Sequence, residues 1–410
     1  MLAYLLVFTA SAGVSFLATP LVRRLSLGLK WIDHPSDRKV HPKPTPTVGG
    51  LAIFLGVAAG LGLSRLIPFL SSLHETSSDV EAALLACLVI LGVGVIDDTK
   101  GMSALGKLAG QTLAAGLLVL LGVQLLFFYF PGQGIVSLDP TLAIPLTVLW
   151  VVAMMNAVNL IDGLDGLAAG RVAIGAIAFF LYMSRAPGVN GQPTTAALLS
   201  AVVAGSALGF LPWNFHPAKI FMGDSGAMLL GLLMAVAAIS GVGRNTYAPS
   251  GGDLAAIAIP VAVPLLVLAI PFLDVMLAIA RRMRRGLGIT HADKEHIHHR
   301  LLDIGHSHRT AVLLMYLWSA LISVCALAVA FINGRMLVGA VVFVALAIAL
   351  VVPKIVLGWT SPGSHRRKGR ANLRAPAVPA PVPEPLPEPA MPAPARPPAS
   401  EPSGRLRDSA

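Results

Sequence analysis

Long apolar runs, separated by short polar segments, constrain this chain more than any other feature of its sequence. A helix that crosses a bilayer needs roughly 20 apolar residues, and about eleven runs meet that length. A chain inside lipid must satisfy its backbone hydrogen bonds internally, so each run is expected to be an α-helix. The runs lie near residues 2–22, 48–70, 81–97, 106–128, 141–158, 166–184, 195–213, 226–242, 254–279, 310–332 and 336–357.

The composition indicates an all-α integral membrane protein and argues against a soluble enzyme. Only 12% of the residues are charged, 55% are hydrophobic, and the mean hydropathy is +0.76. A soluble domain averages about 25% charged residues. Cys87 and Cys325 both lie inside apolar runs, so neither a disulfide framework nor a cysteine metal site is predicted. The first run lacks a preceding basic stretch and a clear cleavage site, so we expect a retained first span.

Lysine and arginine gather in alternate connections, and this pattern predicts the orientation. Residues 23–48 and 281–309 carry much of the positive charge, and such segments face the cytoplasm. With eleven spans, the N-terminus is expected outside and the C-terminus in the cytoplasm. The unusual polar segments then share the cytoplasmic face. The net charge of +10 is explained by this placement and does not indicate nucleic-acid binding.

Two regions are expected along the chain. Residues 1–358 form the polytopic membrane domain, which holds all the polar motifs discussed below. Residues 359–410 begin with a basic cluster and continue as a proline- and alanine-rich segment. A segment of that composition cannot build a packed core, so we expect a disordered cytoplasmic tail.

The segment 156–166 places two amides and two carboxylates between two apolar runs. Asn159, Asp162 and Asp165 are spaced three residues apart, which puts them on one face of a helix or into a glycine-containing turn. Such oxygen donors suit Mg²⁺, which takes one or two protein ligands and fills the rest with water and phosphate. The alternative is a hydrophilic loop between two spans. Asn156 lies one turn deeper and is open to interpretation as an interhelical hydrogen-bonding group.

Two other acidic motifs lie at the ends of apolar runs. Asp97 and Asp98 are adjacent, and their repulsion would be relieved by a divalent metal or by a basic loop. Asp224 precedes the eighth run and is interpreted either as a metal ligand or as a helix N-cap. Phe221, three residues earlier, could stack on a base or simply pack. Helix-end charges in water are the alternative for Asp97 and Asp98.

Three histidines and an arginine occur within five residues of the segment 281–309. They are His296, His298, His299 and Arg300. No cysteine accompanies them, so structural zinc is disfavoured. Imidazoles and a guanidinium could instead bind phosphate or steady a leaving group. The alternative is a solvated loop.

A rigid basic segment leads into the second run. Lys43 lies between prolines, which hold the segment extended. Gly49 and Gly50 then stand at an expected helix start, where backbone N–H groups bind anions favourably.

Taken in order, these motifs resemble the polyprenyl-phosphate N-acetylhexosamine-1-phosphate transferase family. The matching segments span about residues 20–310: Lys43–Gly50, Asp97-Asp98, Asn156–Gly166, Phe221–Gly226 and His296–Arg300. The resemblance implies a reaction dependent on Mg²⁺, with Mn²⁺ as the alternative ion. A polyprenyl phosphate attacks the β-phosphorus of a UDP-sugar, UMP leaves, and a polyprenyl-diphosphate-linked sugar remains.

The resemblance also implies roles for individual residues. Asn159 and Asp224 would hold the metal. Asp97 and Asp98 would lie beside the lipid phosphate, with Asp97 as the favoured base. The donor would be bound by Asp162 and Asp165, by Phe221 against uracil, by Lys43, and by His296 and Arg300. His298 and His299 would contact the donor diphosphate or sugar in a catalytic role.

The histidine motif favours one donor over another. The peptidoglycan branch usually carries an uninterrupted His triplet followed by Phe-Glu, whereas Ile297 interrupts the histidines here and Leu301 follows Arg300. This resembles the branch that uses UDP-N-acetylglucosamine for cell-wall or surface polysaccharides. The alternatives are phospho-N-acetylmuramoyl-pentapeptide transfer, an ion-coupled transporter, and a nonenzymatic scaffold. The expected partners are the UDP-sugar, the polyprenyl phosphate, lipids of the inner or plasma membrane, and a second copy in a homodimer.

Overall fold

The computed structural model describes residues 1–35, 43–130, 134–185, 191–243 and 307–331. These residues are mostly helical. Helices α1 (Leu2–Gly28), α2 (Gly50–Ser64), α3 (Pro68–Thr76), α4 (Asp79–Lys100) and α5 (Ala104–Leu120) come first. Helices α6 (Pro140–Ile161), α7 (Leu167–Met183), α8 (Thr195–Asn214), α9 (Gly223–Ala238) and α12 (His308–Phe331) follow, and a π-helical turn (Ile239–Gly243) extends α9. Expected spans at 254–279 and 336–357 lie outside the described residues.

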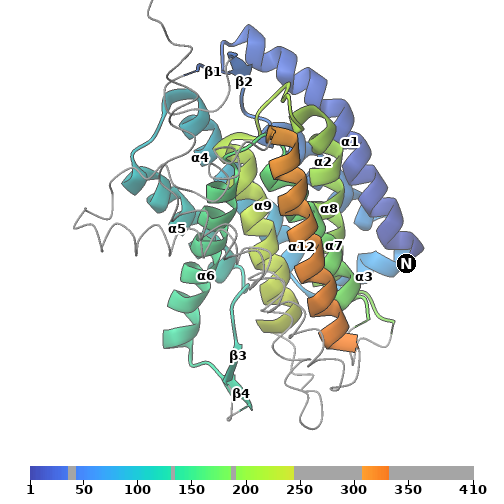
Figure 1. Cartoon of the computed structure of the whole chain (residues 1–410). Coiled ribbons are helices and arrows are strands. Elements are labelled where there is room, and N and C mark those ends of the chain that lie inside the picture. Colours follow the sequence, from blue (N-terminus) through green and yellow to red (C-terminus); the bar gives the residue numbers. More distant parts are fainter. Residues whose placement is uncertain (36–42, 131–133, 186–190, 244–306, 332–410) are drawn as a thin grey trace, which may run out of the picture. The chain divides into compact units, whose positions relative to one another are not determined.

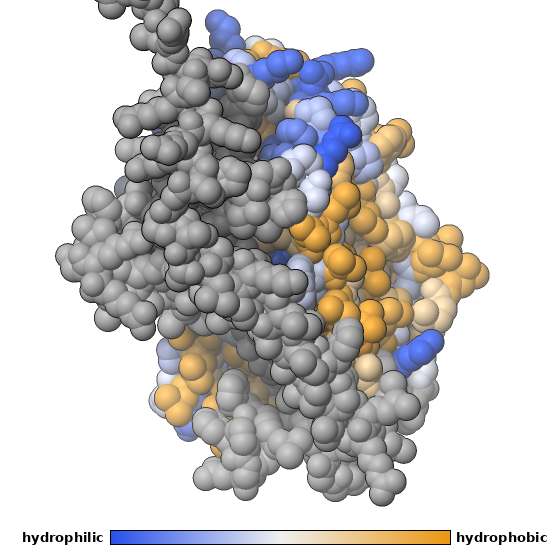
Figure 2. Space-filling view, viewed as in Figure 1, coloured by the Kyte–Doolittle hydropathy of each residue, from blue (hydrophilic) through white to orange (hydrophobic). Residues whose placement is uncertain are grey.

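Six of the described helices are long and apolar enough to cross a membrane, or seven if the bent α2–α3 pair counts as one span. The shorter apolar helices α5 and α7 pack among them. The protein is therefore a multi-pass membrane protein. Hydrophilic side chains gather at the end where β1 and β2 lie, above an apolar belt, on the face shown in Figure 2.

Helices α8 and α9 form the centre of the bundle. In each, 83% of the apolar window is buried inside the protein, against 33% for α1, α6 and α12. A helix that is apolar all round needs neighbours on every side. Small residues allow that approach, since a Cβ at Gly205 or Gly209 would collide with the backbone of α1. The arrangement is visible in Figure 1, where α12 runs beside α7.

The second expected span is bent, which corrects the single helix predicted for residues 48–70. α2 ends at Ser64, and α3 begins at Pro68 after a bend of 99°. Proline fits the first turn of a helix but restricts the residue before it to an extended backbone, which Ile67 adopts. A polar network closes this end, with Glu81 Oε1 accepting from Arg65 Nη2 at 2.8 Å and lying 2.7 Å from His74 Nδ1.

The all-α expectation is incomplete, because two short antiparallel ladders accompany the helices. β1 (Ile32–Asp33) pairs with β2 (Thr45–Pro46), and β3 (Phe127–Phe130) pairs with β4 (Gly134–Ser137). The second ladder occupies part of the span expected at 106–128, because α5 ends at Leu120 and Gly122 turns with a φ of 90°. The ladders lie near opposite ends of the described bundle in Figure 1.

Candidate active site at one end of the bundle

Asp98, near the end of α4, caps the start of α9. Its Oδ1 accepts from the Asp224 N–H at 2.8 Å, and its Oδ2 accepts from Ser225 N–H at 3.2 Å and Ser225 Oγ at 2.7 Å. The first N–H groups of a helix have no partners within it, and a carboxylate is favoured there. The alternative of Asp224 as the N-cap is therefore wrong: Met222 holds that position, and Asp98 supplies the capping oxygens from another helix.

Lys107, in the first turn of α5, lies between two carboxylates from other helices. Its Nζ is 2.5 Å from Asp97 Oδ2, and it also forms an ion pair with Asp224 Oδ2. The other oxygen of Asp97 accepts from the Met102 N–H at 2.7 Å. The sequence predicted that a divalent metal or a basic loop would relieve the repulsion at Asp97 and Asp98. In the structure a cation is supplied by Lys107, which lies on helix α5 and not in a loop.

Asp162 joins the same acidic group from the turn after α6. It follows the last residue of the helix, and its N–H donates to the Asn159 carbonyl at 3.2 Å. Desolvation raises the pKa of the Asp162 carboxyl to about 8, with further contributions from the negative charges of Asp224, Asp98 and Asp165. A carboxyl in that environment binds a proton or a cation readily.

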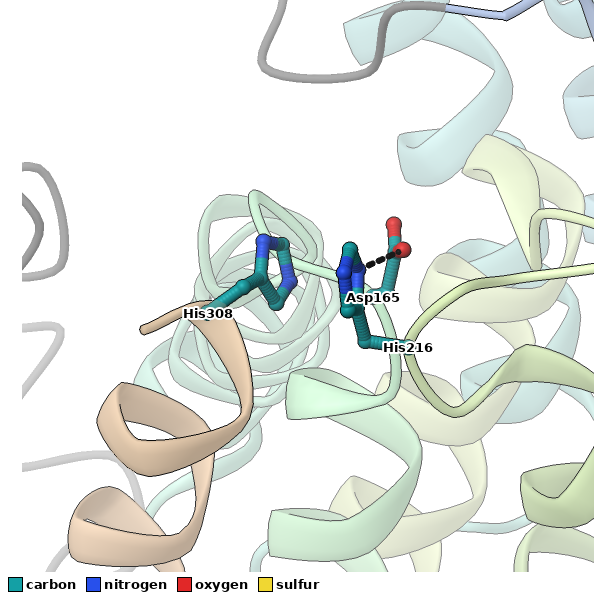
Figure 3. A group of neighbouring side chains, drawn as sticks. All are labelled: Asp165, His216 and His308. Carbon is teal, nitrogen blue, oxygen red and sulfur yellow. Dashed lines mark hydrogen bonds and ion pairs between the residues drawn. The ribbon is translucent and has the colours of Figure 1, made fainter. Parts of the chain in front are cut away.

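Asp165 fastens the turn after α6 to the loop between α8 and α9. Its Oδ2 lies 2.7 Å from His216 Nδ1 and accepts from the Ala218 N–H at 3.1 Å. His308, from the first turn of α12, stacks on His216, with ring centroids 4.1 Å apart and planes inclined by 15° (Figure 3). In the structure Asp165 thus forms hydrogen bonds within the protein. Its expected role in binding the donor stays a prediction.

The group of Asp165, His216 and His308 offers three possible metal-ligating atoms within 4.8 Å of one another. A metal ion binds an imidazole nitrogen along its lone pair, which lies in the plane of the ring. Two nearly parallel stacked rings direct these lone pairs side by side and not toward one point. We therefore interpret the group as a hydrogen-bonded stack that holds three segments together (Figure 3).

Asn156 forms hydrogen bonds between helices, as its interpretation from the sequence predicted. Its Nδ2 donates to Gln111 Oε1 at 2.7 Å and to the Val152 carbonyl at 2.8 Å, and Gln111 Nε2 returns a bond to Asn156 Oδ1 at 3.3 Å. Gln111 belongs to α5 and is almost fully buried. The pair fixes α5, which carries Lys107, against α6, which carries Asn159.

The segment around Lys43 meets the segment around Phe221 through the backbone. The Phe221 N–H donates to the Pro46 carbonyl at 2.8 Å, and its carbonyl accepts from the Gly49 N–H at 3.0 Å. The Gly50 N–H donates to the Met222 carbonyl at 3.0 Å. The expectation that Gly49 and Gly50 offer free N–H groups to an anion is therefore wrong. Lys43 itself is exposed beside this junction.

The donor set at this end fits a hard divalent cation. Four carboxylates from three segments share this end, and Lys107 neutralises part of their charge: Asp97, Asp98, Asp162 and Asp224. Oxygen donors and excess negative charge are what Mg²⁺ prefers. Asn159 lies one turn before Asp162 on α6, so its side chain can face the same side.

Some predicted site residues cannot be placed, and some placed residues were not predicted. The histidine motif, with His296, His298, His299 and Arg300, lies outside the described residues. Sequence reasoning did not single out Lys107, Ser225, His216 or His308 as members of the site. Lys107 carried a usable signal, because it is a lysine at the start of the apolar run that follows Asp97 and Asp98. The histidines carried none, since their meeting depends on the path of α12.

Replacing Lys107 by methionine should destabilise the metal-free protein. Asp97 and Asp224 would lose the ammonium that they share, which we expect to cost about 1–3 kcal/mol at this partly buried position. Thermal unfolding in detergent with EDTA measures the loss, and added Mg²⁺ should restore more stability to the variant than to the wild type. Lys100→Met, at an exposed position on the last turn of α4, is the matched control. Equal unfolding temperatures for the two variants would contradict the ion-pair role.

The raised pKa of Asp162 should make the stability of the metal-free protein depend on pH. Its folded pKa of about 8 lies above the ordinary value of about 3.9 in an unfolded chain. Between those values the folded state binds a proton that the unfolded state lacks, so this contribution falls as pH rises toward 8. Unfolding temperatures of wild type and Asp162→Asn in EDTA, measured from pH 5.5 to 9, should show a shallower slope for the variant. If the unfolding temperatures of wild type and variant change with pH in parallel, Asp162 does not have the raised pKa in the folded protein.

The carboxylates of the candidate site lie within a segment that matches a known protein family. Residues 80–242, which include all the carboxylates above, match the model of the family described as Glycosyl transferase family 4. The chain is 43% identical over 354 residues to the decaprenyl-phosphate N-acetylglucosaminephosphotransferase of Mycobacterium leprae, covering 83% of this chain and 88% of that protein. It is 37% identical over 327 residues to a probable undecaprenyl-phosphate N-acetylglucosaminyl 1-phosphate transferase of Bacillus subtilis, covering 80% and 85%.

A second group of relatives matches less of the chain. The phospho-N-acetylmuramoyl-pentapeptide-transferase of Mycolicibacterium smegmatis is 33% identical over 274 residues, covering 57% of this chain and 75% of that protein. Similarity to the N-acetylglucosamine group therefore extends further along the sequence.

Proposed function

Because this chain belongs to glycosyl transferase family 4, we propose that it transfers N-acetylglucosamine 1-phosphate from UDP-N-acetylglucosamine to a polyprenyl phosphate and releases UMP. The product is a lipid-linked sugar diphosphate, the first membrane intermediate of a cell-wall or surface polysaccharide. One observation carries the proposal: four carboxylates and Lys107 meet at one end of an apolar bundle. Such a site can meet a water-soluble donor and a lipid phosphate at the membrane surface.

We place this end of the bundle at the cytoplasmic face, with the N-terminus outside and the tail inside. Basic residues support the placement, because Arg23 and Arg24 lie in the C-terminal part of α1, and Arg23 Nε donates to the Lys219 carbonyl in the loop before α9 at 3.1 Å. Positive charge marks cytoplasmic connections. Eleven spans and a homodimer remain predictions from the sequence.

Asp224 and Asn159 are the proposed ligands of Mg²⁺, with Mn²⁺ as the alternative. The ion, when bound, neutralises charge on the donor diphosphate and on the departing UMP. Lys107 contacts Asp224 in the metal-free structure, so it can compensate that carboxylate until an ion arrives. Asp98 holds Asp224 in place through the α9 backbone. Phe221, Lys43, Asp162 and Asp165 are proposed for the nucleotide side.

The acceptor phosphate does not require a strong base. Its second pKa is near 6, so at pH 7 it is mostly a dianion already. Asp97, the expected base, has its two oxygens engaged by Lys107 and by the Met102 N–H. We therefore assign Asp97 to positioning Lys107 and assign the Lys107 ammonium to the acceptor phosphate. Positioning and charge neutralisation then carry the reaction, as in phosphoryl transfer generally. His296, His298, His299 and Arg300 remain proposed contacts of the donor.

Two alternatives are weaker. Phospho-N-acetylmuramoyl-pentapeptide transfer fits relatives that match 57% of this chain, against 83% for the relative from M. leprae. An ion-coupled transporter would place its carboxylates along a pathway through the bundle, whereas Asp97, Asp98, Asp162 and Asp224 lie at helix ends.

The test is turnover by the purified full-length chain in nanodiscs. UDP-N-acetylglucosamine, the muramoyl-pentapeptide donor and UDP-N-acetylgalactosamine are each supplied with decaprenyl or undecaprenyl phosphate. We expect UMP release and a lipid-linked N-acetylglucosamine product, identified by mass spectrometry, only when lipid phosphate and Mg²⁺ are both present. Turnover of the muramoyl donor alone would overturn the donor assignment, and full activity in EDTA would overturn the metal assignment.

A further inference from the structure

Helix α12 contacts two loops that carry proposed donor-binding residues, although it lies far from them in sequence. Its Tyr316 hydroxyl donates to the Gly166 carbonyl at 2.5 Å. Its Arg309 Nε donates to the His216 carbonyl at 3.0 Å, and His308 stacks on the His216 ring. Figure 3 shows the start of α12 directed at His216, with Asp165 on the other side of that ring.

Gly166 is the residue through which Tyr316 can set the conformation of the turn. It has a φ of 79°, which favours glycine, and it directly precedes α7. Its N–H donates to Asn214 Oδ1 at 3.1 Å, while its carbonyl accepts from Tyr316 and from the Gly170 N–H. Both sides of this residue are therefore held, and Asp162 and Asp165 lie in the same turn.

The loop between α8 and α9 is held by the same set of segments. Asn214 Nδ2 donates to the Ile220 carbonyl at 3.0 Å, one residue before Phe221. Arg309 and Asp165 hold His216 through its carbonyl and its ring. A shift of α12 would therefore move the turn that carries Asp162 together with the loop that leads to Phe221.

We propose that Tyr316 and Arg309 of α12 are positioning residues for donor binding: through the Gly166 and His216 carbonyls they hold the two loops in the geometry that receives the nucleotide. This inference rests on the proposed function. Neither residue touches the group of Asp97, Asp98, Lys107 and Asp224 in any described contact, so their effect should fall on the donor and not on the lipid phosphate.

A second contact deeper in the bundle makes the inference testable. Arg171 Nε of α7 donates to Ser319 Oγ of α12 at 2.9 Å, and a Cβ at Gly170 would collide with the Tyr316 ring. Removal of the Tyr316 hydroxyl leaves both of these features in place. α12 should therefore stay packed on α7 in Tyr316→Phe, while the Gly166 carbonyl loses one donor.

The experiment compares Tyr316→Phe with Tyr4→Phe in full-length protein. Tyr4 is the matched control because its hydroxyl also takes part in one backbone hydrogen bond, with the Thr194 N–H at 3.0 Å, at the opposite end of α8. We expect Tyr316→Phe to raise the KM for the UDP-sugar and the inhibition constant for UMP about three- to tenfold, the range for one lost hydrogen bond. The KM for polyprenyl phosphate and the unfolding temperature should stay near wild type, and Tyr4→Phe should change none of the kinetic constants.

Arg309→Gln provides a second variant, because it keeps a polar side chain and removes the Nε donor to His216. Arg309→Gln should also raise the inhibition constant for UMP, but by less than Tyr316→Phe does, because Arg309 is exposed. Unchanged donor constants in Tyr316→Phe, or an equal rise for donor and lipid, would overturn the positioning role. If wild type releases no UMP from the donor at all, the proposed function fails instead, and the two failures are thus distinguished.

Discussion

Asp224→Asn is expected to lower the rate of UMP release more than about a hundredfold. Changing a residue that only supports a metal ligand already lowers metal affinity or activity about 10–100-fold, and Asp224 is proposed as a ligand itself. Asparagine keeps the size of the side chain and removes its charge. The variant should lose affinity for Mg²⁺, and Lys107 should lose one of its two carboxylate partners. Initial rates across a Mg²⁺ series measure the effect.

The matched control is Asp79→Asn. Asp79 is a buried aspartate in the first turn of α4 and accepts a bond from Ser240 Oγ at 2.8 Å, while the partly buried Asp224 lies in the first turn of α9. It stands at the other end of α4 from Asp97 and Asp98. We expect this control to change stability and to leave the Mg²⁺ dependence of the folded protein unaltered. Near-normal activity of Asp224→Asn would remove Asp224 from the metal site.

Asp98→Asn is expected to have the second largest effect, for a different reason. The two Asp98 oxygens accept three bonds from Asp224 and Ser225, and asparagine would turn an NH₂ group toward one of these sets of donors. Losing such charge-assisted bonds should cost about 2–3 kcal/mol. The first turn of α9 would shift, and Asp224 with it, so activity should fall at least about tenfold together with the unfolding temperature.

Asp139→Asn is the control for that change, because Asp139 also caps a helix. It accepts from the Thr141 N–H at 2.9 Å at the start of α6, on its own helix and away from the site. It should lower stability without lowering turnover of the folded protein. Ser225→Ala removes one of the three donors to Asp98, so its activity and its unfolding temperature should lie between those of wild type and Asp98→Asn. Full activity in Asp98→Asn would show that the cap does not place Asp224.

The helices were predictable from sequence where apolar length alone decides the structure. α4, α6, α8 and α12 follow the expected runs, because a run of that length has no other stable form in lipid. The bend between α2 and α3 was not predicted, although Pro68 lay inside the run. Hydropathy averages over such a residue, whereas the backbone before a proline does not continue as a regular helix.

The site was predictable only in part. Acidic residues are conspicuous in a chain with few charges, whereas the residues that contact them in the folded protein carry no such signal. Asp97, Asp98 and Asp224 could be singled out from the cost of charge near lipid. That Asp98 caps α9 depends on how α4 packs against α9, which no local pattern reveals. Likewise, Tyr316 is an ordinary aromatic residue of an apolar helix until the turn at Gly166 is seen beside it.

The bend after α2 has a consequence for the lipid around the protein. With 15 residues, α2 is about 22 Å long, shorter than the hydrocarbon core of about 30 Å. The leaflet opposite the candidate site should therefore be thinner beside α2, with head groups and water reaching Arg65, His74 and Glu81. We therefore expect the bilayer beside α2 to be locally thinned, at a modest cost that the lipids around the protein would share.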